Sequence, residues 1–377
     1  YKTFENFGMI KTDDLDASDM PDFFDMVERI ERYVKKYNGV ILDVRQNIPD
    51  FKNKRYGSNT LDMAKLIDEY LFEISNKTSY KNIAILGDDS VIPYYRRLDP
   101  QTSSSSTNEK NYYVDLGMSS YNIPAISDTS KGYIMTDIPY AIYNCIDPET
   151  NKYPKVDAGF GRIFAKEPLQ LCKIIDGYDT PLSLLPGNTT SCLLYLAPDE
   201  GIDWTINTEK AFISVFDEKG FTNRDISEEP FFMPHHYNLY SGAKYLWDEP
   251  QISFSLQFAN LTVINSHASH IGFQTAFYET INNSKVFHNY SGLNIASLPA
   301  RPGTMLLSPG CHSGYSVSYS TNTTGARLFN YSLVTNILAR CISYFAPTTY
   351  GMCVSDGVAY HDRMLKCFMQ NIFDSSN

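Results

Sequence analysis

The chain has 377 residues, 43% of them hydrophobic and 20% charged, with a formal net charge of −11. This composition is that of a globular protein with room for two domains, and it excludes a largely disordered chain. The acidic balance and the lack of a lysine- or arginine-rich run argue against nucleic acid as the main partner, and no apolar run approaches the roughly 18 residues that a membrane span needs.

Helical and strand-like patterns alternate along the chain. In order, they predict a helix at Asp22–Lys36, a strand at Val40–Val44, a helix at Leu61–Ile74, strands at Asn82–Leu86, Tyr133–Thr136 and Phe160–Phe164, and a helix at Pro168–Ile175. They continue with a strand at Cys192–Leu196, a helix at Glu209–Phe216, strands at Leu261–Asn265 and Thr304–Leu307, a helix at Leu328–Ala339 and a strand at Thr348–Val354.

Strands separated by helical patterns are typical of βαβ units. The sequence therefore predicts an α/β fold whose mainly parallel sheets are covered on both faces. In such folds, ligands and functional side chains gather at the carboxyl ends of the strands.

Cysteines and glycosylation sequons bear on the compartment. The seven cysteines are an odd number without C-x-x-C spacing, which argues against a zinc ribbon or a dense disulfide framework. Sequons of the form N-x-S/T occur at Asn76, Asn188, Asn260, Asn282, Asn289, Asn322 and Asn330. Together with the 28 tyrosines, they favour a secreted or cell-surface protein; the chain begins at Tyr1 and contains no visible signal peptide.

Two apolar strands end in segments that carry reactive side chains. His267 follows the strand Leu261–Asn265, and Cys311 follows Thr304–Leu307 after a Pro-Gly turn. A cysteine just past a strand end, flanked by glycines, has the solvent access and backbone amides that a reactive thiolate needs. If the two strands are neighbours in a parallel sheet, both side chains emerge at one edge, where the histidine can relay protons for a thiolate nucleophile. The spacing of 44 residues is close to the roughly 50 that separate histidine and cysteine in caspases.

Other chemistries fit these residues less well. His267 and His270 form an H-x-x-H pair, and His312 adjoins Cys311, but no H-E-x-x-H helix or carboxylate partner accompanies them, so no metal site is predicted. The segment 310–314 resembles a nucleophile elbow with histidine at its centre, which disfavours a serine hydrolase. Neither G-x-G-x-x-G nor a P-loop is present, which disfavours nucleotide chemistry.

At these residues the sequence resembles the gingipain family of cysteine peptidases, within the clan of caspases and legumains. Ser266–Ser269 with Phe273 fits the family's histidine block, which is G-H-G-S and an aromatic residue four positions after the serine; this register selects His267 rather than His270. Cys311–Tyr315 fits the family's C-x-x-G-F/Y block. Three earlier segments resemble the family's G-D-x-x-x-I-P, S-D-x-x-Y and D/E-x-x-x-G-R-I/F blocks in the same order, namely Ile85–Arg96, Thr136–Ala141 and Asp157–Ala165.

The resemblance covers roughly residues 20–360 and implies two side-by-side α/β subdomains. The N-terminal subdomain would be 1–156 and the caspase-like catalytic subdomain 157–377. The implied activity is that of a cysteine endopeptidase acting on peptide or protein substrates, with Cys311 as nucleophile, His267 as acid and base, and Asp157 as the acid that assists the histidine. Backbone N–H groups of Cys311 and Ala268 would hold the oxyanion, and Phe273 would take part in substrate binding. No cofactor is required, although Ca²⁺ is common in such secreted relatives; no EF-hand loop is present.

The missing glycine after His267, together with a sequon-bearing surface rich in tyrosine and asparagine, keeps a second interpretation open. Ala268 replaces the usual glycine after the histidine, and Gly310 stands where alanine often precedes the cysteine. Neither removes a catalytic atom, because alanine keeps its backbone N–H. The alternatives are a non-catalytic surface or adhesion module on the same fold, and a legumain- or caspase-like specificity on the same scaffold.

The hypothesis on specificity depends on one carboxylate. Asp356 follows the predicted strand Thr348–Val354, the third strand end beside the catalytic pair. A carboxylate there can pair with an arginine or lysine at P1, the residue on the amino side of the cleaved bond. The competing interpretation is a solvated Ser-Asp-Gly turn.

Overall fold

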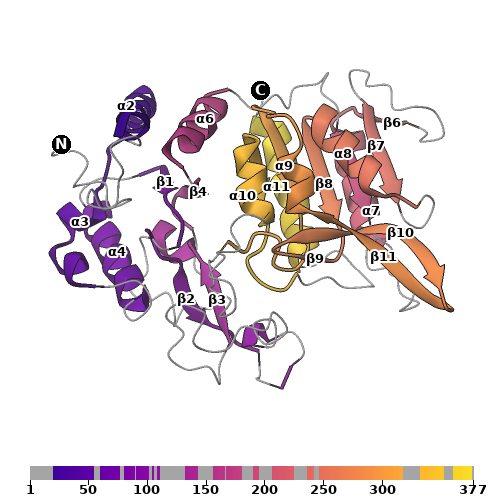
Figure 1. Cartoon of the computed structure of the whole chain (residues 1–377), viewed down its shortest axis with the longest axis horizontal. Coiled ribbons are helices and arrows are strands. Elements are labelled where there is room, and N and C mark those ends of the chain that lie inside the picture. The colour runs from indigo at the N-terminus through magenta and orange to yellow at the C-terminus, as the bar shows by residue number, and fades with distance from the viewer. Residues whose placement is uncertain are drawn as a thin grey trace. The chain divides into compact units, whose positions relative to one another are not determined.

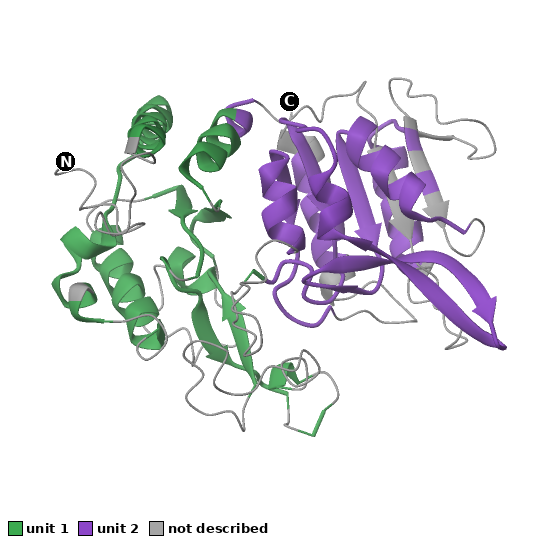
Figure 2. Ribbon diagram, viewed as in Figure 1, with its two compact units in different colours: residues 1–176, 316–329 green, residues 177–315, 330–377 purple. Residues whose placement is uncertain are grey.

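The computed structural model (Figure 1) describes residues 20–54, 60–76, 80–89, 91–101, 104–105, 108–110, 132–142, 156–165, 167–180, 190–194, 206–224, 236–241, 246–316, 332–351 and 360–375. These residues combine helices with mainly parallel sheets, so the predicted α/β fold is confirmed. The chain divides into two compact units (Figure 2), here called unit 1 (residues 1–176 and 316–329) and unit 2 (residues 177–315 and 330–377).

The two units divide the chain differently from the predicted subdomains 1–156 and 157–377. Strand β4 (Gly159–Ile163) pairs in parallel with β1 (Asn82–Leu86), so the segment after residue 156 belongs with unit 1. The subdomain bounds 1–156 and 157–377 stay a prediction from the resemblance.

Unit 1 joins helices to two small sheets. Its described helices are α2 (Met20–Lys36), α3 (Val44–Asn47), α4 (Thr60–Ser75) and α6 (Pro168–Tyr178, whose last two residues fall in unit 2), with the 3-10 turns η2 (Pro49–Asn53) and η3 (Ile138–Ala141). Strands β1 and β4 form one sheet, and β2 (Tyr95–Leu98) pairs antiparallel with β3 (Tyr133–Thr136) in the other. Helix α2 buries its predicted apolar stripe, which includes Phe23, Met26 and Ile30.

The predicted strand Val40–Val44 is wrong. Val40 is 75% exposed, and the Asp43 carboxylate accepts the N–H groups of Arg45 at 2.9 Å and Gln46 at 3.2 Å. An aspartate at the N-cap satisfies the first N–H groups of a helix. The apolar run before Asp43 therefore leads into α3 rather than into a sheet.

Unit 1 buries two arginine–carboxylate pairs. Arg96 and Asp89 have fully buried side chains and are joined by two hydrogen bonds of 2.5 Å, and Asp89 also accepts the N–H of Tyr94 at 2.7 Å. Arg162 pairs with Asp137 at 2.6 Å, with both side chains less than a tenth exposed. Buried charges are tolerated only when they are paired and hydrogen-bonded. The Asp89–Arg96 pair lies within the first motif segment, whereas Arg162 joins all three segments, because it also donates to the carbonyl oxygens of Gly87 at 2.8 Å and Ile92 at 2.6 Å.

Unit 2 is built on a six-stranded sheet in the order β13-β12-β8-β5-β7-β6. The strands are β5 (Thr190–Leu194), β6 (Thr222–Arg224), β7 (His236–Ser241), β8 (Leu261–Asn265), β12 (Thr304–Leu307) and β13 (Ile342–Phe345). All neighbouring pairs are parallel. The described helices of this unit are α7 (Ile206–Glu218), α8 (Glu249–Phe258), α9 (Gly292–Ala296), α10 (Leu333–Ala339) and α11 (Tyr360–Ser375).

Helices cover both faces of this sheet (Figure 1). Alternate residues of a strand point to opposite faces. On β12, Leu306 packs with apolar residues of α8, α9 and α10, whereas Met305 and Leu307 pack with residues of α7 and α11. β8 is buried along its whole length. The predicted double covering of the parallel sheet is therefore confirmed in unit 2.

A second, three-stranded sheet in unit 2 has the order β11-β10-β9. It comprises β9 (Ala268–Ser269), β10 (Gly272–Ile281) and β11 (Ser284–Ser291). The β10–β11 hairpin turns at Asn282 and Asn283, whose φ angles are 52° and 63°, as a two-residue type I′ turn requires.

The last predicted strand is misplaced. The structure forms β13 at Ile342–Phe345 instead of a strand at Thr348–Val354, because residues 342–345 pair in register with 304–307 of β12. Residues 348–351 are not in a strand, and residues 352–354 lie outside the described residues. The predicted helix at Leu328–Ala339 begins at Leu333 after Ser332; residues 328–331 also lie outside the described part.

Within the described residues, none of the helices combines the length and the apolar character needed to cross a membrane.

Candidate active site

The strands that lead to His267 and Cys311 are direct neighbours. β12 pairs in parallel with β8, with Met305 opposite Leu261 and Leu307 opposite Val263. Parallel neighbours end at the same edge of a sheet. The structure therefore meets the condition under which the two side chains emerge at one edge.

The turns that carry His267 and Cys311 also touch each other. An ideal Cβ placed on Gly310 would lie 2.6 Å from the Cβ of Ala268 and 2.8 Å from the carbonyl oxygen of Ser266. These two neighbours flank His267 on either side, and Gly310 directly precedes Cys311. Real Cβ atoms do not approach other atoms this closely, so the contact has room for a side chain on only one of the two turns.

The Cys311 turn is held by the segment that follows β13. Ser308 donates its N–H to Phe345 at 3.0 Å, His312 donates to Thr349 at 2.8 Å, and Gly314 donates to Pro347 at 2.8 Å. These three bonds bracket Cys311, whose side chain is half-buried. A turn fastened at so many points holds its side chains in a fixed position, as a functional group on a sheet edge requires.

The N–H of Ala268, the residue after His267, points away from the neighbouring strand of the three-stranded sheet. The N–H of Gln274 donates to the His267 carbonyl at 2.8 Å, and Ala268 lies opposite Phe273. In an antiparallel ladder, hydrogen-bonded and non-hydrogen-bonded pairs alternate. Ala268 and Phe273 therefore form a non-hydrogen-bonded pair, and the Ala268 N–H points away from β10, toward the open edge of β9.

The two other histidines of this region are buried. His270 is 4% exposed, and His312 has no exposed surface. Tyr315 contacts both rings edge-on, at centroid distances of 6.1 Å and 6.3 Å. His267, in contrast, is exposed. Of the two members of the H-x-x-H pair, only His267 is therefore accessible to a substrate.

Burial affects the protonation of these two histidines. It lowers the pKa of His312 to about 3, and burial together with the neighbouring His312 lowers the pKa of His270 to about 4, from the usual 6.5. Below pH 6.5 the unfolded chain binds the protons that the folded chain refuses. Above pH 6.5 we expect the two histidines to cost the folded protein no stability. As the pH drops from 6.5 toward 4, each should lower the free energy of unfolding by up to about 1.4 kcal/mol per pH unit.

Thermal unfolding of His312→Asn and of the wild type between pH 7 and 5 checks this expectation. Burial raises the pKa of the Asp68 carboxyl to about 7, so Asp68 also titrates in this range, but its contribution is common to both proteins and cancels in their comparison. Asparagine suits the positive φ of 53° at this position. The variant should lose less stability on acidification than the wild type. His288→Asn is the matched control, since the His288 side chain is 41% exposed. Parallel pH curves for His312→Asn and the wild type would contradict the expectation.

Three further predicted site residues are Asp157, Phe273 and Asp356. Asp157 belongs to unit 1 and donates its N–H to Ala141 at 2.8 Å; its pairing with His267 stays a prediction. Phe273 is fully buried in the core beside Trp247, and a direct role in substrate binding is not favoured by this burial. Asp356 lies outside the described residues.

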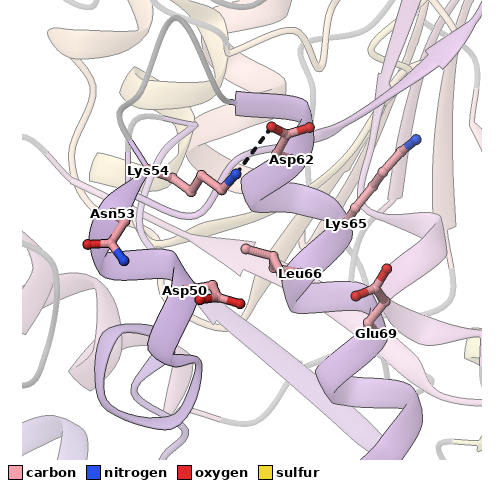
Figure 3. A pocket seen from close by; sticks show the side chains of 7 residues that line it. All are labelled: Asp50, Asn53, Lys54, Asp62, Lys65, Leu66 and Glu69. Atoms are coloured by element: carbon pink, nitrogen blue, oxygen red, sulfur yellow. Dashed lines mark hydrogen bonds and ion pairs between the residues drawn. The ribbon is translucent and has the colours of Figure 1, made fainter.

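A surface pocket of about 510 Å³ lies elsewhere, between η2 and α4 of unit 1 (Figure 3). Its walls carry three carboxylates and two ammonium groups, from Asp50, Asp62, Glu69, Lys54 and Lys65, together with Asn53 and Leu66. Lys54 and Asp62 form an exposed ion pair at 3.5 Å. Such an open pocket of mixed charge, with no cysteine, serine, threonine or histidine among its described lining residues, does not make a second candidate site.

The described residues contain no group of three or more histidine, cysteine, aspartate or glutamate side chains that could hold a metal ion. Two contacts at the sheet edge were not predicted from the sequence: Gly310 against Ala268, and the peptide group of Gly351 against the Cys311 sulfur. Glycine at both positions was the available signal, because glycine often marks a close backbone approach.

No protein-family model and no curated protein matches the sequence. Among solved structures, one named "Structure of Protease" aligns with a TM-score of 0.42 and 11% identity over 76% of this chain and 50% of its own. The chain thus spans about half the length of that protein. A similarity this low assigns neither a fold family nor an activity, so membership of the gingipain family stays a prediction from the motifs.

Proposed function

We propose that the chain is a cysteine endopeptidase of the gingipain type, which hydrolyses peptide bonds through Cys311 and His267. The observation that carries the proposal is the contact of the two turns at the ends of the neighbouring parallel strands β8 and β12. It brings an exposed imidazole and a half-buried thiol to one sheet edge. Thiolate and imidazole are the two groups that acyl transfer by a cysteine peptidase needs.

In the proposed reaction, the Cys311 thiolate attacks the carbonyl carbon of the scissile peptide bond and forms a C–S bond. The N–H groups of Cys311 and Ala268 stabilise the oxyanion, and the outward direction of the Ala268 N–H supports this role. The C–N bond then breaks as His267 gives its proton to the leaving amine. Water attacks the thioester, His267 takes its proton, and the acid product leaves with the thiolate restored. Asp157 is proposed to orient the imidazole.

The proposed specificity is for a basic P1 residue, with Asp356 as the pocket carboxylate. The test uses matched fluorogenic peptides that differ only in Arg, Lys, Asn or Asp at P1, with wild type and Asp356→Asn, each in Ca²⁺ and in EGTA. We expect cleavage after Arg and Lys that Asp356→Asn reduces. Preferred cleavage after Asn or Asp would replace this specificity with a legumain- or caspase-like one, and cleavage of none of the peptides would favour the non-catalytic module. Loss of activity in EGTA would reveal a Ca²⁺ requirement.

We also propose a secreted or cell-surface location. Two sequon asparagines in unit 2 support it, since Asn282 at the hairpin turn and Asn289 on β11 are both exposed.

The contact between Gly310 and Ala268 gives a prediction about this activity. A Cβ on Gly310 would meet the Ala268 Cβ at 2.6 Å, so Gly310→Ala should force the two turns apart and lower kcat/KM by up to about 100-fold. Ala268→Gly alone should change kcat/KM little. The double variant should recover most of the loss, although not all, because the Ser266 carbonyl oxygen remains 2.8 Å from the new Cβ.

Steady-state kinetics on the wild type, the two single variants and the double variant form a complete double-mutant cycle. Additive effects of the two substitutions would show that the turns do not interact through these positions. Gly161→Ala, where a Cβ would meet nothing within 4 Å, controls for the general cost of adding a methyl group at a glycine.

A further inference from the structure

The backbone of Gly351 faces the sulfur of Cys311. Its N–H donates to the sulfur at 3.3 Å, and its carbonyl oxygen lies 3.7 Å from the sulfur, in position to accept the thiol proton. The two residues are forty positions apart in the chain. One residue thus contacts the thiol through both its backbone donor and its backbone acceptor, which belong to successive peptide groups.

Only glycine fits at position 351. An ideal Cβ there would overlap the Pro309 carbonyl oxygen and would lie 3.3 Å from the Cys311 nitrogen. The approach is held from the preceding residues, because Pro347 and Thr349 accept N–H groups from Gly314 and His312 at 2.8 Å. A side chain at position 351 would push its peptide group away from the Cys311 turn.

The N–H and the carbonyl act on different forms of the sulfur. A hydrogen bond donated to a charged group favours the charged form, whereas an acceptor favours the protonated form. The adjacent His312 ring supplies no positive charge near neutral pH, because burial lowers its pKa to about 3. A thiolate at Cys311 therefore gains from the oriented N–H dipole, in the way that backbone amides stabilise anions at other sites.

We propose that Gly351 is a positioning residue for Cys311: its peptide N–H stabilises the thiolate and fixes the direction in which the sulfur points. The role of Cys311 as a nucleophile rests on the proposed function. The effect of Gly351 on the thiol does not, and it can be measured in the absence of any substrate.

The experiment measures the rate at which iodoacetamide alkylates Cys311 as a function of pH, by mass spectrometry of the full chain after digestion. The central variant replaces Gly351 with glycolic acid by nonsense suppression, which turns the N–H into an ester oxygen and adds no atom that could clash. We expect the apparent pKa of Cys311 to rise by about one unit, so that alkylation below this pKa slows about tenfold. Gly351→Ala should slow alkylation in the same sense, because its Cβ displaces the N–H from the sulfur.

Two controls accompany these variants. Cys367 is exposed on α11, and its alkylation in the same molecules should not change. Gly161→Ala adds a methyl group where nothing lies within 4 Å, and its Cys311 should react as in the wild type. If Gly351→Ala fails to fold, the ester variant still decides the question.

The outcomes separate this inference from the proposed function. A Cys311 pKa that rises in the ester variant supports the role of Gly351, whether or not the wild type cleaves peptides. An ester variant whose Cys311 titrates as in the wild type overturns the inference, even if the wild type is an active peptidase. A parallel slowing at Cys367 would also overturn it, since the effect would then be a general loss of structure.

Discussion

Cys311→Ala is expected to lower kcat/KM on peptide substrates by at least about 10⁴-fold, because it removes the atom that forms the acyl-enzyme. Binding and the oxyanion donors remain, so substrate affinity should change far less than kcat. The measurement is hydrolysis of a fluorogenic peptide, followed by labelling of the wild type with an acyloxymethyl ketone. Label should appear on Cys311 in preference to Cys367, although Cys367 is the more exposed of the two.

His267→Ala should cost nearly as much as Cys311→Ala, and the double variant should be little slower than either, because the two groups act as one unit. His288→Ala is the matched control, a partly exposed histidine on β11 whose ring lies 3.7 Å from the Glu279 carboxylate. Cys367→Ala is the matched control for Cys311→Ala. Activity that survives both Cys311→Ala and His267→Ala would remove this pair from the mechanism.

Asp89→Asn is expected to destabilise the folded protein by about 3–5 kcal/mol. The Arg96 guanidinium would remain fully buried without its counter-charge, although asparagine can still accept the N–H of Tyr94. Urea unfolding followed by circular dichroism gives the loss of stability. Hydrogen exchange at the amides of β2 should accelerate most, because Arg96 lies on that strand.

The exposed ion pair of Lys54 and Asp62 provides the control, since their side chains are 31% and 56% exposed. Asp62→Asn should cost less than about 1 kcal/mol. Replacing both members of the buried pair, by Asp89→Leu with Arg96→Met, should recover most of the stability lost in Asp89→Asn. If Asp89→Asn lowers the free energy of unfolding no more than Asp62→Asn does, the buried pair is not essential to unit 1.

The elements that the sequence predicts well are those whose own pattern decides their structure. Helix α2 has a complete apolar stripe, and β8 and β12 are short apolar runs closed by polar turns. The last strand was misplaced because residues 342–345 and 348–354 both suit a strand. Pairing with β12 selects the former, and such a choice depends on tertiary contacts that no local window contains.

Some features of the candidate site can likewise be predicted from the sequence, and others cannot. His267 and Cys311 are predictable because each follows a recognisable strand end, and the motifs distinguish His267 from His270. The approach of Gly351 to Cys311 is not predictable, since it joins backbone atoms forty residues apart through a segment outside any strand. Phe273 matches the aromatic position of the motif, yet the fold places it in the core, because a motif specifies a residue type and not its surroundings.

The contact between the turns that carry His267 and Cys311 has room for only one methyl group, and this limits the routes by which the two turns can evolve. In the gingipain pattern that the sequence resembles, glycine follows the histidine and a small residue, often alanine, precedes the cysteine, whereas this chain has Ala268 and Gly310. Alanine at both positions would place two Cβ atoms 2.6 Å apart. A lineage that exchanges one arrangement for the other by single substitutions must therefore pass through an ancestor with glycine at both positions, whose turns are costlier to order on folding. Among homologues, these two positions should change together.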